Sequence, residues 1–175
     1  IQRQGWSIEC RINAEDPYRQ FLPSTGRLIR FQPPKTTMFQ SDTQQLWGVR
    51  VDTGVQEGGE ISMHYDSMIA KLIVHGRDRN DAIQKMRDAL NAFVIRGISS
   101  NIPFQAALLA HPKFVSGDFN TGFIAENYAH GFRAEDVPHD DPDFLVALAA
   151  FVRRKSRERA ANISGQLPGY DVQIG

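Results

Sequence analysis

The chain has 175 residues, 41% of them hydrophobic, and its 20 Lys plus Arg are balanced by 20 Asp plus Glu. This length can bury one good core, while a formal net charge of zero argues against nucleic-acid binding, which usually requires a basic field. No apolar run approaches the ~20 residues of a membrane span and no secretory signal is expected, so we predict a soluble protein of a reducing compartment, or a piece of one.

Residues 6–13 alternate strictly between apolar and polar side chains, which predicts a strand with one buried face. The apolar face comprises Trp6, Ile8, Cys10 and Ile12, and the polar face comprises Ser7, Glu9, Arg11 and Asn13. Arg11 is a fixed cation there, because arginine keeps its proton near neutrality, and its planar fork suits a two-oxygen anion. Pattern alone favours a plainer interpretation, in which Glu9 and Arg11 are solvated on the outside of an antiparallel sheet.

Cys10 is the single cysteine of the chain and has no partner for an internal disulfide. Its place on the apolar face predicts a small buried side chain, since a catalytic thiol needs an exposed, electropositive setting. The five histidines lack the spacing of metal ligands, and no glycine-rich phosphate loop occurs. The residues themselves therefore predict neither a metal site nor a nucleotide site.

Further strands are predicted between residues 27 and 75. A turn at 23–26 precedes a strand over 27–32, Pro33 and Pro34 end it, and a polar loop follows to about Gln45. Strands are then expected over 47–52, 59–63 and 68–75, the first two joined by a turn over 53–58. These strands are expected to form an antiparallel sheet. Asp66 precedes the last strand, where an acid can cap a turn or pair with a cation.

Helices are predicted in the second half of the chain. The first helix begins at Asp78, carries apolar residues at helical spacing and ends at Gly97. Two further helices are expected over 101–110 and 121–129. Residues 133–143 are acidic and contain two prolines, which is typical of a linker. A single helix over 144–161 follows, with an apolar first half and a basic second half. The fold class is therefore α+β, an antiparallel sheet packed with helices and followed by a linker and one long helix.

Six segments of the sequence, in order along the chain, resemble one protein family. They are ECRINAEDP (9–17), LPSTGRL (22–28), WGVRVDTGVQEGGEIS (47–62), HYDSMIAKLIVHG (64–76), VIRGISSNI (94–102) and GDFNTGFI (117–124). The chain from Gly5 to about Phe132 resembles the C-terminal part of the biotin carboxylase component of biotin-dependent carboxylases. The third and fifth segments look most like the alpha subunits of propionyl-CoA carboxylases and their acyl-CoA relatives.

The resemblance implies a domain division. Residues 1–132 match the biotin carboxylase C-terminal domain, 133–143 are an acidic linker, and 144–175 are a helix and the truncated start of a following biotin-transfer or carrier-linking region. The resemblance also places the ATP-grasp machinery of this family upstream of these residues, so we expect the chain alone to be inactive. Because the chain opens without a methionine and soon enters a strand, we interpret it as a piece of a longer protein.

The activity implied by the resemblance is ATP-dependent carboxylation of biotin with bicarbonate. Arg11 matches the arginine of the family's ECR motif, which is the implied catalytic residue, because a fixed guanidinium stabilises negative charge on the ureido oxygen more than it stabilises neutral biotin. Glu9 and Asn13 share its predicted face and are supporting candidates. Trp47 and Arg50 match positions that relatives use in homodimer contacts, and Asp66 is a further candidate for subunit contact.

The resemblance further implies the cofactors and partners. Biotin is carried on a carrier domain, and ATP and Mg²⁺ have their ligands upstream of these residues. The implied partners are the upstream ATP-grasp domain, the biotin carboxyl carrier domain and a carboxyltransferase beta subunit, with no nucleic acid and no membrane. The implied location is the cytoplasm, or the mitochondrial matrix in a eukaryote.

Two alternatives remain at this point. In one, the chain is a non-catalytic module that docks other subunits through its sheet, the edge around Trp47 and Arg50, and the helix beginning at Phe144. In the other, it belongs to the biotin carboxylase part of an acetyl-CoA or pyruvate carboxylase. A long helix after the linker favours a multidomain alpha subunit, since free-standing subunits of this family usually end soon after their final helix.

Overall fold

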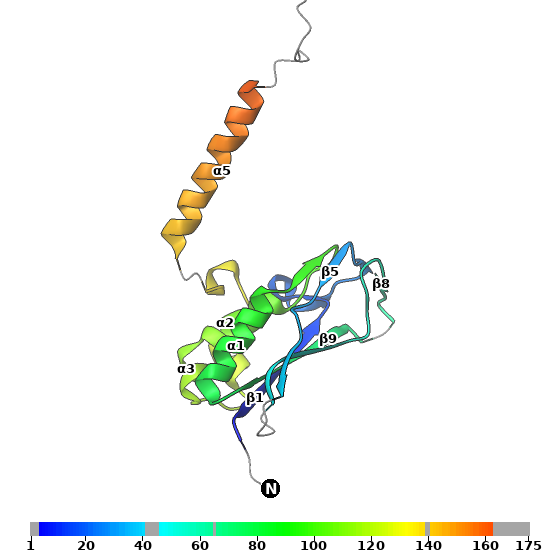
Figure 1. Cartoon of the computed structure of the whole chain (residues 1–175), viewed down its shortest axis with the longest axis vertical. Coiled ribbons are helices and arrows are strands. Elements are labelled where there is room, and N and C mark those ends of the chain that lie inside the picture. Colours follow the sequence, from blue (N-terminus) through cyan, green and yellow to red (C-terminus); the bar gives the residue numbers. More distant parts are fainter. Residues whose placement is uncertain (1–3, 41–45, 65, 139–140, 163–175) are drawn as a thin grey trace, which may run out of the picture. The chain divides into compact units, whose positions relative to one another are not determined.

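A computed structural model describes residues 4–40, 46–64, 66–138 and 141–162, with only the backbone for residues 38–40, 46–47 and 161–162. The chain divides into two compact units, Ile1–Pro138 and His139–Gly175. The first unit combines an antiparallel sheet with helices and the second contains one long helix (Figure 1). The predicted α+β class is confirmed.

The main sheet has four antiparallel strands in the order β1, β9, β7 and β6. Their bounds are Trp6–Asn13 for β1, Met68–Gly76 for β9, Leu46–Thr53 for β7 and Thr37–Gln40 for β6. Strands β1, β7 and β9 confirm three predicted strands. Leu72 and Val74 of β9 are fully buried, so this inner strand supplies the middle of the core.

Strand β6 lies within the segment that the sequence predicted to be a polar loop, and that prediction was wrong. Thr37 pairs with Val49 of β7, and the Val49 N–H donates to Thr37 Oγ1 at 3.1 Å. The Thr37 carbonyl approaches Gly48 so closely that a Cβ on that glycine would lie 1.5 Å from it. The pairing thus depends on the missing side chain at Gly48, which a local reading of residues 33–45 does not reveal.

Three two-stranded sheets accompany the main one. They pair β2 (Glu15–Asp16) with β3 (Leu22–Pro23), β4 (Gly26–Arg27) with β8 (Glu60–Ile61), and β5 (Arg30–Gln32) with β10 (Val94–Arg96). The predicted strand over 27–32 is therefore wrong as one element, because the Leu28 N–H donates to the Gly59 carbonyl and the Ile29 N–H to the Arg96 carbonyl. The backbone hydrogen-bond partner of this segment therefore changes between Leu28 and Ile29. The predicted strand over 59–63 shortens to β8 and lies outside the main sheet.

Helix α1, Arg79–Asn91, lies over one face of the sheet against β9 and β1 (Figure 1). It buries Ala82, Ile83, Met86, Ala89 and Leu90, the side chains at helical spacing. The helix ends at Asn91, short of the predicted end at Gly97, because residues 94–96 leave it to pair with β5. Gly97 instead permits a close approach, since a Cβ there would lie 2.1 Å from the Arg27 carbonyl oxygen.

The remaining helices of the first unit are short. They are α2 (Ile102–Ala110), α3 (Pro112–Ser116) and α4 (Phe123–Asn127), with 3-10 turns η1 (Pro17–Arg19) and η2 (Ala134–Asp136). Helix α2 confirms the prediction over 101–110, α4 is shorter than the predicted 121–129, and α3 was not predicted. Phe104, Ala107 and Phe132 form a second buried cluster under these helices.

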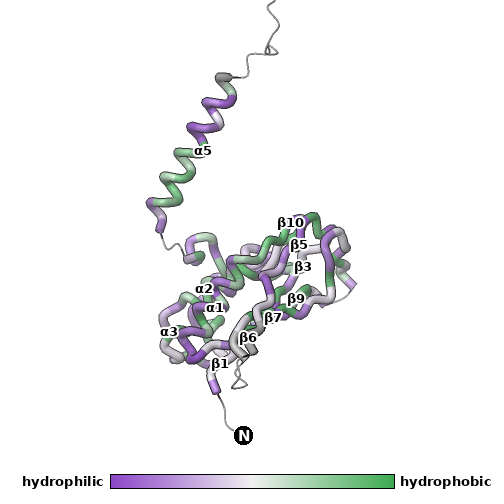
Figure 2. Tube along the Cα trace, viewed as in Figure 1, coloured by the Kyte–Doolittle hydropathy of each residue, from purple (hydrophilic) through white to green (hydrophobic). Residues whose placement is uncertain are grey.

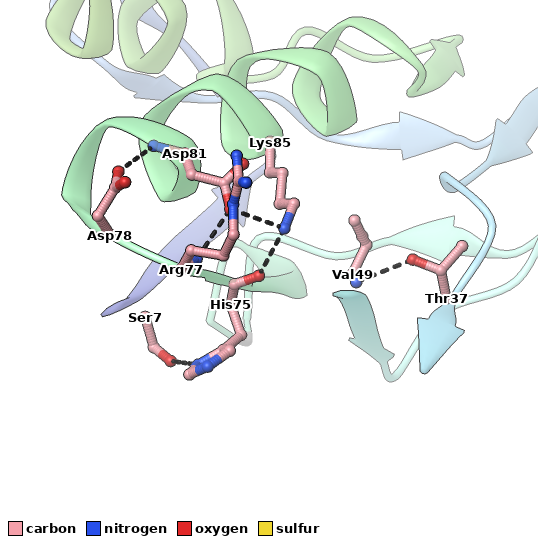
Figure 3. A network of polar contacts seen from close by, with 8 residues as sticks. All are labelled: Ser7, Thr37, Val49, His75, Arg77, Asp78, Asp81 and Lys85. Atoms are coloured by element: carbon pink, nitrogen blue, oxygen red, sulfur yellow. Dashed lines mark hydrogen bonds and ion pairs between the residues drawn. The ribbon is translucent and has the colours of Figure 1, made fainter. Parts of the chain in front are cut away.

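A polar network fixes the junction between β9 and α1 (Figure 3). The Asp81 carboxylate accepts a hydrogen bond from the Arg77 backbone N–H at 2.8 Å and from Lys85 Nζ at 3.0 Å. The hydrogen bond from the Arg77 backbone, followed by that from Lys85, lowers the pKa of Asp81. Ser7 of β1 and His75 of β9 join at 2.8 Å between Oγ and Nδ1. Lys85 Nζ also donates to the His75 carbonyl oxygen at 3.3 Å, so the network ties the first turns of α1 to β9 and, through Ser7, to β1.

Helix α5, Pro142–Asn162, forms the second unit and matches the helix predicted over 144–161. Its first half is apolar and its second half hydrophilic (Figure 2). Phe144, Val146 and Val152 are each more than half exposed. Within the described residues, none of the helices combines the length and apolar character needed to cross a membrane.

Replacing Leu72 by alanine tests the role of β9 as the centre of the core. The side chain is 0% exposed, so its loss leaves a cavity, and we expect Leu72→Ala to lower the free energy of unfolding by about 2–5 kcal/mol. Ile29→Ala is the matched control, since Ile29 is 70% exposed and its loss costs within about 0.5 kcal/mol. Urea titration followed by circular dichroism measures both, and equal losses would contradict this placement of the core.

Candidate active site

Strand β1 lies at the edge of the main sheet and directs its apolar residues to the core as predicted, with one exception. Ile12 is fully buried, and Ile8 and Cys10 are half-buried against the core. Trp6 is 50% exposed, so its prediction as a buried residue was wrong. It pairs with Gly76, the last residue of β9, which has no side chain to extend the core beneath the indole.

Glu9 and Arg11 lie together on the opposite, exposed face of β1. Arg11 Nε is 3.5 Å from Glu9 Oε1, and the two side chains are 68% and 44% exposed. An exposed ion pair of this length contributes little to stability. Among the described contacts of this side chain, the Glu9 contact occupies one of five guanidinium donors, so Arg11 retains donors for an anion.

Asn13 does not continue this exposed row. A bulge shifts the register between Ile12 and Asn13, and the half-buried Asn13 amide donates from Nδ2 to Glu15 Oε1 at 3.1 Å. Glu15 Oε1 also accepts from Ser67 Oγ at 2.6 Å. The structure thus brings Glu9 and Arg11 together and directs Asn13 into a separate polar network, because a bulge interrupts strict alternation.

Two residues that sequence reasoning did not assign to the site hold the backbone of Arg11. Asn101 Nδ2 and Gln105 Nε2 donate to the Arg11 carbonyl oxygen at 3.0 Å and 2.6 Å. The sequence predicted Asn101 only as the residue that opens α2. The buried position of an asparagine next to a helix start would have been the signal, but burial is not visible in one sequence.

A pocket of about 530 Å³ lies beside β1 and α2. Its polar lining comes from Glu9, Arg11, Glu15, Asn101 and Gln105, and its apolar lining includes Phe21, Phe104, Leu108, Phe114 and Ile124. A cation beside apolar walls suits a ligand with an anionic or carbonyl-bearing head and an apolar body.

The other predicted residues lie elsewhere in the fold. Arg50 donates to both carboxylate oxygens of Asp52, from Nε at 2.8 Å and from Nη2 at 2.7 Å. This bidentate bond raises the pKa of Arg50 and fixes its planar fork. Asp66 accepts a hydrogen bond from the Met68 N–H at 3.0 Å and so caps the start of β9. The side chain of Trp47 lies outside the described residues.

The Cys10 thiol is kept protonated by its surroundings. Burial, followed by the charge of Glu9, raises the pKa of the thiol to about 12. The thiol is therefore not available as a nucleophile near neutral pH. Across the described ranges of the chain, His, Cys, Asp and Glu form no group of three or more that could hold a metal ion.

We expect native Cys10 to resist alkylation by iodoacetamide at pH 8. A thiol with a pKa near 12 is ionised in about one molecule in ten thousand at that pH, whereas an unfolded cysteine is ionised in roughly a quarter. Mass spectrometry of labelled protein, with and without guanidinium chloride, measures the difference. Comparable labelling rates in the two conditions would show that the thiol is neither buried nor protonated.

Comparison with known proteins gives a consistent assignment. The profile described as "Biotin carboxylase C-terminal domain" matches residues 9–126. The chain is 45% identical over 185 residues to the propionyl-CoA carboxylase alpha chain of Ruegeria pomeroyi. This alignment covers 100% of this chain and 27% of the relative. It is 43% identical over 161 residues to the mitochondrial propionyl-CoA carboxylase alpha chain of Mus musculus, covering 91% and 21%.

A solved structure agrees with these relatives. The fold is similar to the biotin carboxylase domain dimer of Hydrogenobacter thermophilus 2-oxoglutarate carboxylase in complex with MgADP, ADP and bicarbonate, with a TM-score of 0.66 and 34% identity. That similarity covers 81% of this chain and 28% of the solved one. The chain thus spans about a quarter of the length of the relatives it matches.

Proposed function

This chain belongs to the biotin carboxylase C-terminal domain family, as the C-terminal part of such a domain in a propionyl-CoA carboxylase-like alpha chain, and we propose that the complete protein carboxylates biotin. The reaction consumes ATP and bicarbonate and leaves the carboxyl group on biotin held by a carrier. The observation that carries the proposal is the exposed guanidinium of Arg11, which β1 carries beside a pocket with apolar walls.

Arg11 is the proposed catalytic residue. Biotin supplies a ureido group whose oxygen gains negative charge during carboxylation, and a preorganised cation stabilises that charge more than it stabilises the neutral starting group. The residues fit such a group, because Arg11 and Gln105 line the pocket together with aromatic and aliphatic residues. Glu9, at 3.5 Å, orients the guanidinium without holding it tightly.

ATP and Mg²⁺ are proposed to bind to the part of the protein upstream of these residues. Support comes from the solved relative, which holds MgADP and bicarbonate in a domain more than three times the length matched here. The proposed contribution of this chain is to hold Arg11 and the wall of the pocket. The proposed partners are that upstream domain, a biotin carrier domain and a carboxyltransferase subunit. The proposed location is the cytoplasm, or the mitochondrial matrix in a eukaryote, as the name of the mouse relative suggests.

Trp47, Arg50 and Asp66 are proposed contacts to a second subunit. Arg50 and Asp52 are exposed on β7, with 63% and 44% of their side chains accessible, and their bidentate bond presents a rigid polar surface. The solved relative is a dimer of biotin carboxylase domains. The proposed domain division keeps residues 1–132 as the family domain, 133–143 as a linker and 144–175 as the start of the next region; the boundary of compact units after Pro138 falls inside that linker.

Substitution of Arg11 in the complete carboxylase tests the proposed role. We expect Arg11→Ala to lower biotin carboxylation by roughly 10²–10³-fold, as for removal of one oxyanion donor, with an unchanged KM for ATP. Arg11→Lys keeps the charge but loses the planar fork and should restore part of the rate. Arg96→Ala is the matched control, because Arg96 is also an exposed strand arginine, on β10. Incorporation of labelled bicarbonate and melting curves of each variant measure these outcomes.

Near-normal turnover of Arg11→Ala would reject the catalytic assignment and favour the plainer role of a solvated strand arginine. A solvated arginine is worth within about 0.5 kcal/mol of stability and nothing in rate. Equal losses in Arg11→Ala and Arg96→Ala would indicate a general effect of lost surface charge.

The isolated chain is expected to show no bicarbonate-dependent ATP hydrolysis. The proposed phosphate-binding elements lie upstream, so these residues alone have nothing to orient ATP. Phosphate release from the purified chain, compared with the complete carboxylase at equal molarity, measures this. Turnover above the no-protein background would refute the assignment of the nucleotide site to the upstream domain.

A further inference from the structure

Asn101 is a buried polar residue that precedes α2, with 8% of its surface exposed. Its Nδ2 donates to the Arg11 carbonyl oxygen and its Oδ1 accepts from the Asn13 N–H, both at 3.0 Å. Its own backbone N–H donates to the Asn13 carbonyl at 3.1 Å. A residue of a neighbouring strand pairs with an edge strand in the same way: it donates to the carbonyl of one residue and accepts from the N–H of the residue two positions later. One side chain therefore continues the ladder on the outer edge of β1.

The backbone carbonyl of Asn101 accepts a hydrogen bond from the Gln105 N–H of α2 at 3.1 Å, but its side chain does not serve its own helix. Its backbone has φ −79° and ψ 5°, and its side chain makes no capping hydrogen bond to α2. The amide instead reaches a residue 90 positions earlier in the chain. Burying an amide costs free energy unless each polar atom has a partner, and both amide atoms are satisfied by β1. The arrangement is therefore specific to the segment that carries Arg11.

The position of the Arg11 guanidinium depends on its backbone. The side chain is 68% exposed and its contact to Glu9 is long, so packing does not fix it. β1 is also an edge strand, paired with β9 on its inner side alone within the main sheet. Asn101 and, at 2.6 Å from the same carbonyl oxygen, Gln105 hold the outer side. The backbone of Arg11 is thus held by Lys71 of β9 on one side and by these two side chains on the other.

We propose that Asn101 is a positioning residue that holds Arg11 in register, with Gln105 as a second support. The inference rests on the proposed function, because it gives Asn101 a role only if the guanidinium acts on the substrate. A shift of about 1 Å at a reacting centre can cost a hundredfold in rate, so loss of the backbone clamp should appear in turnover before it appears in substrate affinity.

Asn101→Asp in the complete carboxylase is the sharpest variant. It keeps the size of the residue and the acceptor for the Asn13 N–H, but it replaces the donor to the Arg11 carbonyl with an oxygen. We expect kcat for biotin carboxylation to fall roughly 10- to 100-fold with an unchanged KM for ATP. Asn127→Asp is the matched control, since Asn127 Nδ2 also donates to a backbone carbonyl, that of Phe123, away from the pocket lining.

A double-mutant cycle with Arg11→Ala separates positioning from general structure. If Asn101 acts through the guanidinium, adding Asn101→Asp to Arg11→Ala should change kcat by no more than about twofold. Losses that multiply, or a normal kcat in Asn101→Asp alone, would overturn the inference. A normal kcat in Arg11→Ala alone would instead overturn the proposed function.

Melting curves decide which variant enters the cycle. If Asn101→Asp does not fold, Gln105→Met replaces it, because this change keeps the side-chain length and removes one donor to Arg11. The expected loss is smaller, about 3- to 10-fold, and it should also disappear in the Arg11→Ala background. Persistence of that loss would count against the positioning role.

Discussion

Strand β1 pairs antiparallel with β9 over all eight of its residues, and this register decides which side chains reach the core and which reach solvent. It directs Ile12 into contact with the buried residues under α1, and it directs Glu9 and Arg11 to the opposite face. A slip of one residue would exchange the two faces and bury the charges. The core and the candidate active site are therefore consequences of the same pairing.

The same register sets the charge around Arg11. Lys71 lies beside Arg11 on β9 and Asp52 lies beside Lys71 on β7. Asp52 is bound by Arg50 through two short hydrogen bonds, whereas the contact between Glu9 and Arg11 is a single long one. The positive charge on this face is thus least compensated near Arg11 and Lys71, which favours an anion there.

Elements with strong periodicity could be predicted from the sequence. Elements that form through pairing between distant segments could not. Three elements carry a clear hydrophobic pattern: the alternation of β1, the apolar run of β9 and the helical spacing of α1. These elements could therefore be predicted, and so could the exposed pair of Glu9 and Arg11 on β1. Strands β6 and β10 form because a partner lies opposite them, and their own residues carry little signal. Asn101 escaped prediction for the same reason, since its partners lie about 90 positions away.

Gly48 has a consequence for the outer boundary of the sheet. Its missing Cβ is what lets the Thr37 carbonyl, and with it β6, lie against β7. A single methyl group at this position would push β6 away and leave unpaired N–H and C=O groups on residues 46–49, the half of β7 that β6 covers. Unpaired backbone groups along a strand are a template for association with other chains. The hydrogen atom that Gly48 carries in place of a side chain thus lets β6 shield this part of β7 from pairing with other chains.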